Sequence, residues 1–211
     1  MTTTTTTETR VMTPAEIAAA KAEERKARKQ LAATKVYCRA IDRRVKRHSQ
    51  LCRIFGQVLS PDGNSYEWRE FSSENERDQA MNGGIRRRAT AWSRNGSIVF
   101  VDYSYQSDAH QLPNLVKFYF YADGGLAKMH IVLNALDMPA GSEGKLMVVL
   151  DRFYDDKGNS LAYADNFLDP RTRKKKPEVG YSANVGIDYL RMRHTKDLPF
   201  SDLLQKPRPK S

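Results

Sequence analysis

The sequence lacks the long apolar runs that a membrane protein needs. Its best apolar run, Leu146 to Leu150, is far shorter than the roughly 18 consecutive apolar residues of a transmembrane helix. The start of the chain also lacks the basic segment and the apolar stretch of a secretory signal, and six threonines follow Met1 instead. Two localisations fit this start: a cytoplasmic protein, or an exported protein whose natural signal was removed and replaced by Met1.

Cysteine is scarce, since Cys38 and Cys52 are the only two in 211 residues. No Gly or Pro lies between them, and an unbroken helix would separate them by about 21 Å. A disulfide tolerates a Cα separation of only about 7 Å, so we expect two reduced cysteines that pack as small apolar side chains on one helix face. The sequence has no CxxC, and it therefore predicts no metal site.

Recognisable catalytic motifs are missing as well. The sequence has no Gly-rich phosphate loop, no G-x-S-x-G elbow and no HExxH. Asp102, Asp151 and Asp165 lie in or near expected strands and could meet in a pocket, but three aspartates spread over 64 positions are weak support for catalysis. We expect no catalytic residue, no cofactor and no enzyme activity.

The N-terminal part of the chain is typical of a helix. Residues 1–12 are polar and rich in Thr, which predicts a disordered leader. Thr13 can cap a helix that has Pro14 at its first position and Glu16 completing a capping box. Alanine and charged residues then dominate to about residue 35, so residues 13–34 are predicted to form a basic helical arm.

An apolar stripe continues this helical pattern toward residue 56. Its members recur at spacings of 3, 4, 3, 4 and 3, which places them on one helix face: Cys38, Ile41, Val45, His48, Cys52 and Phe55. We interpret residues 35–56 as a core helix with this face packed on a sheet. His48 is then expected to be a buried core histidine.

The rest of the chain favours strands joined by tight turns. Asn95-Gly96 between two β-rich runs is the preferred two-residue hairpin turn. Turn-connected strands pair antiparallel. The predicted fold is therefore α+β, a long N-terminal helix followed by an antiparallel β-meander that curves around the helix as a roll, with a core domain at 35–169 and a basic C-terminal extension at 170–211. The expected strands are 66–71, 86–93, 98–105, 115–121, 126–136, 145–154 and 161–163.

Aromatic residues concentrated in neighbouring strands favour a binding function. Alternation puts Phe118 and Phe120 on one face of their strand and Tyr119 and Tyr121 on the other. One face should be core, and a tyrosine-rich face could bind a ligand by stacking. The leading hypothesis is a non-catalytic binding or scaffold module that recognises a small ligand or a protein partner through a β-sheet face. Its candidate ligand-binding residues are Tyr103, Tyr105, Tyr119 and Tyr121.

The net charge of +10 and the pI near 9.6 favour an acidic partner. From Lys21 to Arg53 the chain has 12 Lys or Arg against 3 acidic residues, and a rigid row of cations suits phosphate contacts. The alternative hypothesis is a nucleic-acid-binding, ribonucleoprotein or capsid assembly protein that uses residues 21–53 and 171–176. Its candidate residues are Arg39, Arg43, Arg44, Lys46, Arg47, Arg53, Arg171, Arg173, Lys174, Lys175 and Lys176.

Overall fold

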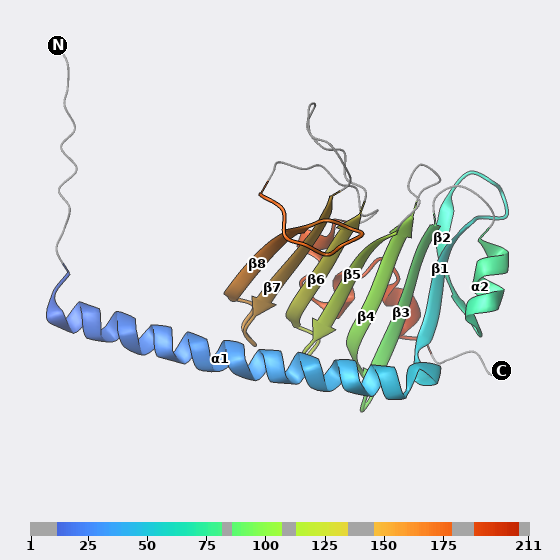
Figure 1. Cartoon of the computed structure of the whole chain (residues 1–211). Coiled ribbons are helices and arrows are strands. Elements are labelled where there is room, and N and C mark those ends of the chain that lie inside the picture. The colour runs from blue at the N-terminus through green and yellow to red at the C-terminus, as the bar shows by residue number, and fades with distance from the viewer. Residues whose placement is uncertain (1–11, 82–85, 107–112, 135–145, 179–187, 207–211) are drawn as a thin grey trace, which may run out of the picture.

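One long helix lies against an open eight-stranded antiparallel sheet (Figure 1). The computed structural model describes residues 12–81, 86–106, 113–134, 146–178 and 188–206, so all of the predicted leader except Met12 lies outside the described residues. The predicted α+β class is confirmed. The main elements are α1 (Pro14–Arg47), β1 (Arg53–Leu59), β2 (Tyr66–Phe71), α2 (Glu74–Ala80), β3 (Arg86–Arg94), β4 (Ser97–Gln106), β5 (Asn114–Phe120), β6 (Leu126–Asn134), β7 (Met147–Tyr154), β8 (Ser160–Leu168) and the short α3 (Ser201–Leu204).

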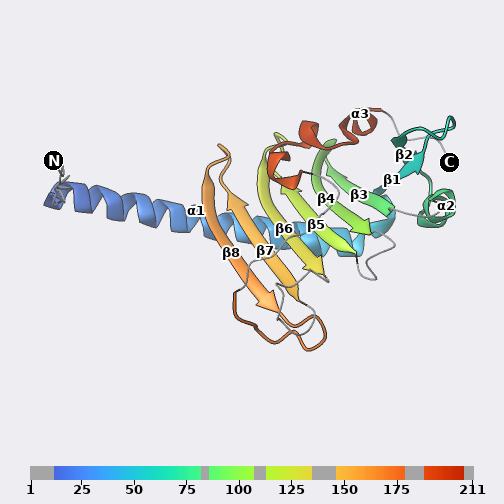
Figure 2. The same ribbon diagram turned by 90° about the horizontal axis from the view of Figure 1, so that it is seen from above.

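Helix α1 begins where its capping residues predict. The Thr13 hydroxyl accepts a hydrogen bond from the Glu16 backbone, and the Glu16 carboxylate accepts one from the Thr13 backbone at 2.7 Å. From there α1 crosses the strands near one end of the sheet, and its N-terminal part extends beyond β8 (Figures 1 and 2). Alanine-rich composition and the Arg28–Glu24 pair at 2.6 Å support this projecting part locally.

The helix ends at Arg47, so the prediction of a core helix to residue 56 was wrong. His48 is the C-cap and is exposed, Ser49–Leu51 form a 3₁₀ turn, and Phe55 lies in β1. Cys38 and Cys52 do not form a disulfide, as expected, although a continuous helix is not what separates them. The 3-4 spacing continued past the helix end because His48, Cys52 and Phe55 fell into the same pattern by coincidence.

The sheet is a meander with one departure from sequential order. The strand order is β2-β1-β3-β4-β5-β6-β7-β8, so β1 lies between β2 and β3. The predicted hairpin at Asn95-Gly96 is confirmed, and both residues have the positive φ that this turn requires. Within the described residues 188–193, Tyr189–Arg191 form a 3₁₀ turn.

The two faces of the sheet carry separate apolar clusters. Cys38 and Ile41 of α1 pack with Trp92, Phe100 and Tyr119 on one face. The larger cluster lies on the opposite face, where the C-terminal segment covers it (Figure 2). Within that segment Phe200 is 2% exposed and stacks on Phe55 with ring centroids 4.8 Å apart. Part of the region predicted as a basic extension therefore completes the core.

A close backbone approach fixes the C-terminal segment to the β5–β6 turn. Gly124 has φ +90°, and a Cβ there would lie 2.5 Å from the His194 ring. The Gly124 carbonyl accepts from the Thr195 backbone at 3.0 Å, and His194 Nε2 lies 3.0 Å from the Asp123 carbonyl. A glycine is required here both for its φ and for the space it leaves.

Gly124→Ala should therefore destabilise the protein by about 2–4 kcal/mol, because it combines an unfavourable φ with overpacking against His194. Gly158→Ala is the matched control, since Gly158 has φ +82° with no atom within 4 Å of the added Cβ. The control should cost only about 1–2 kcal/mol. Urea unfolding measures both, and equal losses would contradict the close approach.

Candidate functional site

The four candidate tyrosines do not share an accessible face. Tyr103 and Tyr105 belong to the large core cluster and are 1% and 7% exposed. Tyr119, 3% exposed, and Tyr121 pack on the opposite face beside α1. The predicted alternation within β5 is correct, but the tyrosine-bearing face is the one that the helix covers, and the β4 tyrosines point the other way.

The hydroxyls on the helix side hold α1 to the sheet. Tyr119 donates to Asp42 at 2.7 Å, and Tyr121 donates to the Tyr154 carbonyl at 2.9 Å. Tyr121 also lies 2.9 Å from the Thr34 hydroxyl. Burial, together with the bond to Asp42, raises the pKa of Tyr119, so this phenol keeps its proton. These contacts give Tyr119 and Tyr121 a structural role.

A cleft of about 550 Å³ opens between the C-terminal half of α1 and the sheet. This volume is in the range of small-molecule sites. Val45, Phe100 and Tyr119 supply apolar or aromatic surface, and most of the other lining groups are polar or charged. The complete lining is Asp42, Val45, Lys46, Ser49, Cys52, Glu74, Thr90, Phe100, Asp102, Lys117, Tyr119, Lys128 and His130.

The floor of the cleft contains a row of ionisable side chains that crosses four strands. Asp102 of β4 is opposite Lys117 of β5, Lys117 is opposite His130 of β6, and His130 is opposite Asp151 of β7. Directly opposed residues point to the same face, so the four form one line. Each side chain is only 24–36% exposed, and three of the four line the cleft itself.

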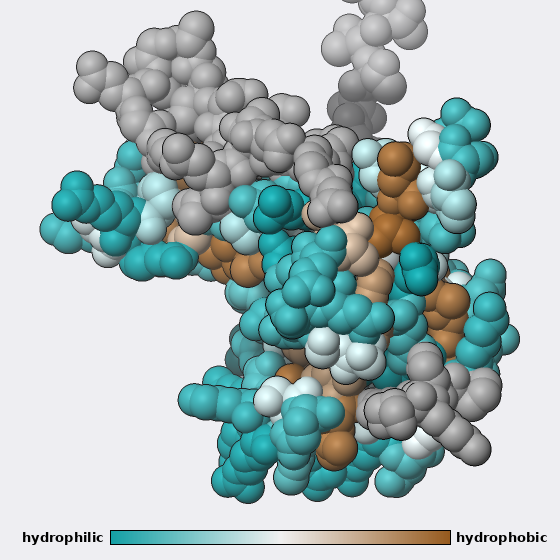
Figure 3. Space-filling view, turned by 90° about the vertical axis from the view of Figure 1, so that its right-hand side faces the viewer, coloured by the Kyte–Doolittle hydropathy of each residue, from teal (hydrophilic) through white to brown (hydrophobic). Residues whose placement is uncertain are grey.

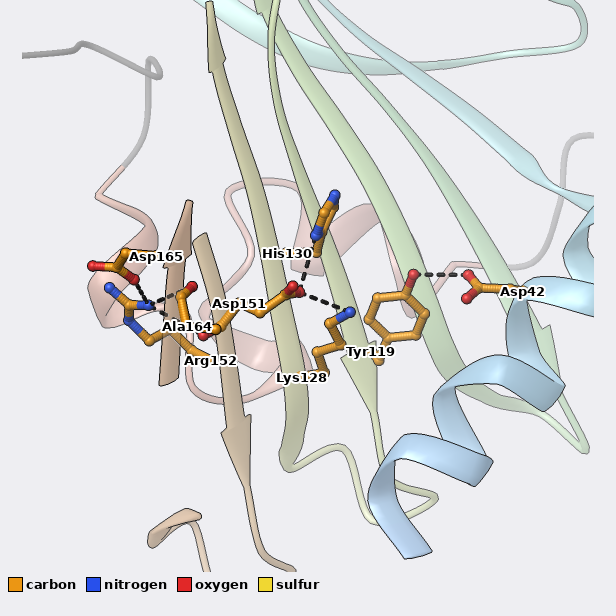
Figure 4. A network of polar contacts seen from close by, with 8 residues as sticks. All are labelled: Asp42, Tyr119, Lys128, His130, Asp151, Arg152, Ala164 and Asp165. Atoms are coloured by element: carbon orange, nitrogen blue, oxygen red, sulfur yellow. Dashed lines mark hydrogen bonds and ion pairs between the residues drawn. The ribbon is translucent and has the colours of Figure 1, made fainter. Parts of the chain in front are cut away.

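Asp151 organises one end of this row (Figure 4). Its Oδ1 lies 2.8 Å from Lys128 Nζ and 3.0 Å from His130 Nδ1. Burial opposes ionisation, but the hydrogen bonds from His130 and Lys128 outweigh it and lower the pKa of Asp151 to about 2. Because an ionised carboxylate only accepts, Nδ1 carries a proton. The other ring nitrogen, Nε2, points away from Asp151 (Figure 4).

Asp102, at the other end of the row, forms a longer ion pair than Asp151 does. Burial raises its pKa, and Lys117 only partly offsets this. The Lys117 ammonium is 3.7 Å from Asp102 Oδ2, beyond ordinary hydrogen-bond lengths. Both groups therefore retain capacity for a further partner in the cleft.

The three aspartates considered in the sequence do not meet. Asp102 and Asp151 share the helix-side face, whereas Asp165 is paired with Arg152 near the β8 edge (Figure 4). Asp165 is opposite Leu150 of the far-face core, so it points away from the cleft.

The basic residues predicted on α1 are largely available. Arg39, Arg43, Arg44, Lys46 and Arg47 are all exposed. None of these five forms an ion pair with another residue in the described part of the chain. Lys46 also lines the cleft.

Arg53 was predicted to belong to the polyanion-binding surface, but it is buried. It is 7% exposed and forms a two-point ion pair with Glu70. It also donates to the carbonyls of Leu203 and Leu204 at 2.6 and 2.8 Å. Through these contacts the guanidinium joins β1, β2 and the end of the C-terminal segment. It is therefore not available to bind a polyanion.

The second predicted basic segment lies away from α1. Residues 171–176 follow β8 and are found at the opposite end of the strands from the helix (Figure 1). Four of the five predicted cations there are exposed, and Lys176 lies 3.7 Å from Asp169. Arg171, Arg173, Lys174, Lys175 and Lys176 are thus not continuous with the cations of the helix.

Sequence reasoning missed this row of ionisable side chains. A signal was present, because Asp102, Lys117, His130 and Asp151 each interrupt a strand with mostly apolar or aromatic neighbours. Seeing that they meet requires the strand register, which the sequence alone does not give.

No protein-family model, no curated protein and no solved structure matches this chain. Among the described residues, no cluster of His, Cys, Asp or Glu could hold a metal ion. No described helix is long and apolar enough to cross a membrane.

The two ends of the row should affect stability with opposite signs. The lowered pKa of Asp151 gives a stabilising contribution that is complete above its ordinary value of 3.8 and is lost as the pH falls toward 2. Asp151→Asn should therefore cost about 1–2 kcal/mol at pH 6, and the difference from wild type should shrink between pH 4 and 2.

The raised pKa of Asp102 has the reverse effect, because its ionisation disfavours folding as the pH rises through that pKa. Asp102→Asn should leave stability at pH 6 unchanged or increased, and any gain should disappear below pH 3.8. Urea unfolding across this pH range compares the two variants. A loss for both at pH 6 would show that Asp102 is a satisfied structural group.

Proposed function

We propose that the protein is a non-catalytic binding module that holds a small zwitterionic molecule in the cleft between α1 and the sheet. The observation that carries this proposal is the loosely paired Asp102 and Lys117 at the cleft floor. Half-buried charges that lack a close partner lower stability. Charged side chains that lower the stability of a protein but are present in a concave site are characteristic of functional sites.

The charge distribution favours a ligand with both signs. Asp102 can accept from an ammonium group, while Lys117 and the nearby Lys46 can bind a carboxylate. The Phe100 and Tyr119 rings supply apolar contact for the atoms between the two charges. A dianion or a dication would place one like charge against the floor, which costs binding energy.

Binding is favoured over catalysis because the strongest hydrogen-bonding groups are already paired. Asp151 holds Lys128 and His130, and Asp42 holds Tyr119. These pairs keep the cleft walls in place. The absence of a catalytic motif from the sequence supports the same proposal.

A thermal-shift screen followed by calorimetry tests the proposal with four probes of similar size: γ-aminobutyrate, succinate, 1,4-diaminobutane and a neutral polyol. We expect γ-aminobutyrate to raise Tm most. Asp102→Asn or Lys117→Met should weaken its binding about ten- to a hundred-fold, since a hydrogen bond to a charged group contributes about 1.5–3 kcal/mol.

Asp165→Asn is the matched control, because it removes a cross-strand carboxylate on the other face of the sheet. The increase in Tm that γ-aminobutyrate causes in this variant, measured from the variant's own Tm, should equal the increase in wild type. Preference for the diacid or the diamine, equal effects of the Asp102 and Asp165 variants, or no shift with any probe would contradict the proposal.

A further inference from the structure

Two short rows of cations lie one after the other along the outer surface of α1. Lys21, Arg25 and Lys29 recur every fourth residue, and Arg39, Arg43 and Arg47 repeat the spacing 18 residues later. Eighteen residues are five full helical turns, so the two triplets share one side of the helix. We call these six residues the cation ridge.

The cation ridge is directed away from the sheet. Its centre lies about 140° around the helix from Cys38, at 3.6 residues per turn, and Cys38 is packed against the sheet. All six residues are exposed, and none forms an ion pair within the described part of the chain. The helix acids that do pair engage Lys26 and Arg28, which lie outside the ridge.

The length and rigidity of the ridge match an extended partner. It spans about 39 Å, with its two triplets about 27 Å apart, at 1.5 Å per residue. No Gly or Pro interrupts the helix after Pro14, so the spacing is fixed. The N-terminal triplet is on the part of α1 that projects past β8 (Figures 1 and 2), where the sheet does not obstruct a partner.

The chemistry of the surface favours nucleic acid over a lipid surface. Interfacial helices bury large apolar or aromatic side chains in the membrane. The exposed large apolar residues of α1 are limited, within its described length, to Ile17 and Val36. The β2 and α2 side of the protein is also mostly hydrophilic, with small separate hydrophobic areas (Figure 3). Two exposed aliphatic side chains, neither of them aromatic, give little surface for insertion into a membrane, so these cations suit a partner bound through phosphates.

We infer that the cation ridge binds the phosphate backbone of double-stranded nucleic acid without reading its sequence. A duplex presents closely and regularly spaced phosphates along a stiff axis, and a ridge of about 39 Å covers roughly one turn of it. Arginine and lysine contacts to phosphate position a protein but do not distinguish bases. The net charge of +10 assists association. This surface is separate from the ligand cleft.

Fluorescence anisotropy of the full chain with duplex DNA of about 20 base pairs, measured from 50 to 300 mM salt, tests the inference. Six neutralised phosphates give a slope near −5 in log affinity against log salt, at about −0.9 per contact. Lys21→Gln, Arg25→Gln and Lys29→Gln together should reduce the slope by about 2.7, and Arg39→Gln, Arg43→Gln and Arg47→Gln together should do the same.

The matched control is the triple variant Arg171→Gln, Lys174→Gln and Lys175→Gln, which removes equal charge at the other end of the sheet. Its slope should equal that of wild type, and two duplexes of unrelated sequence should bind equally. Equal losses in all three variants would show a net-charge effect only. Absence of binding, tighter binding to single strands, or preference for vesicles containing about 30% anionic lipid would each overturn the inference. Because Lys46 is left intact, none of these outcomes bears on the cleft.

Discussion

The width of a single helix limits what it can cover on this sheet. An α-helix is about 10–12 Å across, whereas same-face residues along a strand recur about every 6.6–7 Å. A helix laid across the strands therefore covers one or two rows of side chains. The covered row is mostly apolar or aromatic, with Phe100 and Tyr119 beneath Cys38 and Ile41, and Lys128 is its one charged member. The next row contains Asp102, Lys117, His130 and Asp151, and the cleft occurs where the helix no longer reaches.

The opposite face is closed by a different arrangement. No long helix lies there among the described elements, and the C-terminal segment inserts Leu198 and Phe200 into the core. Arg53 fixes the end of this segment, because one buried guanidinium binds Glu70 and two backbone carbonyls. A buried charged side chain therefore holds in place a short segment that has little regular structure of its own.

Local signals in the sequence were sufficient for much of the fold. Thr13 and Glu16 locate the helix start, and Asn95-Gly96 locates the central hairpin, because each depends on neighbouring residues alone. The helix end was missed since Cys52 and Phe55 continue the helical spacing by coincidence. Alternation correctly separated Phe118 from Tyr119 within β5, but it does not relate one strand to the next. Showing that Tyr103 and Tyr119 lie on opposite faces of the sheet required the register, and so did recognising the row of ionisable side chains in the cleft.

The contact between Arg53 and the Leu204 carbonyl joins positions 151 residues apart. Contacts of such long range form slowly, because a large loop must close before they contribute. Until residues 198–204 are in place, the sheet has an uncovered apolar face that includes Phe55. A chain that is still emerging from a ribosome exposes this face to solvent and to other chains. Synthesis of residues 198–204 is therefore the step after which this apolar face can be covered.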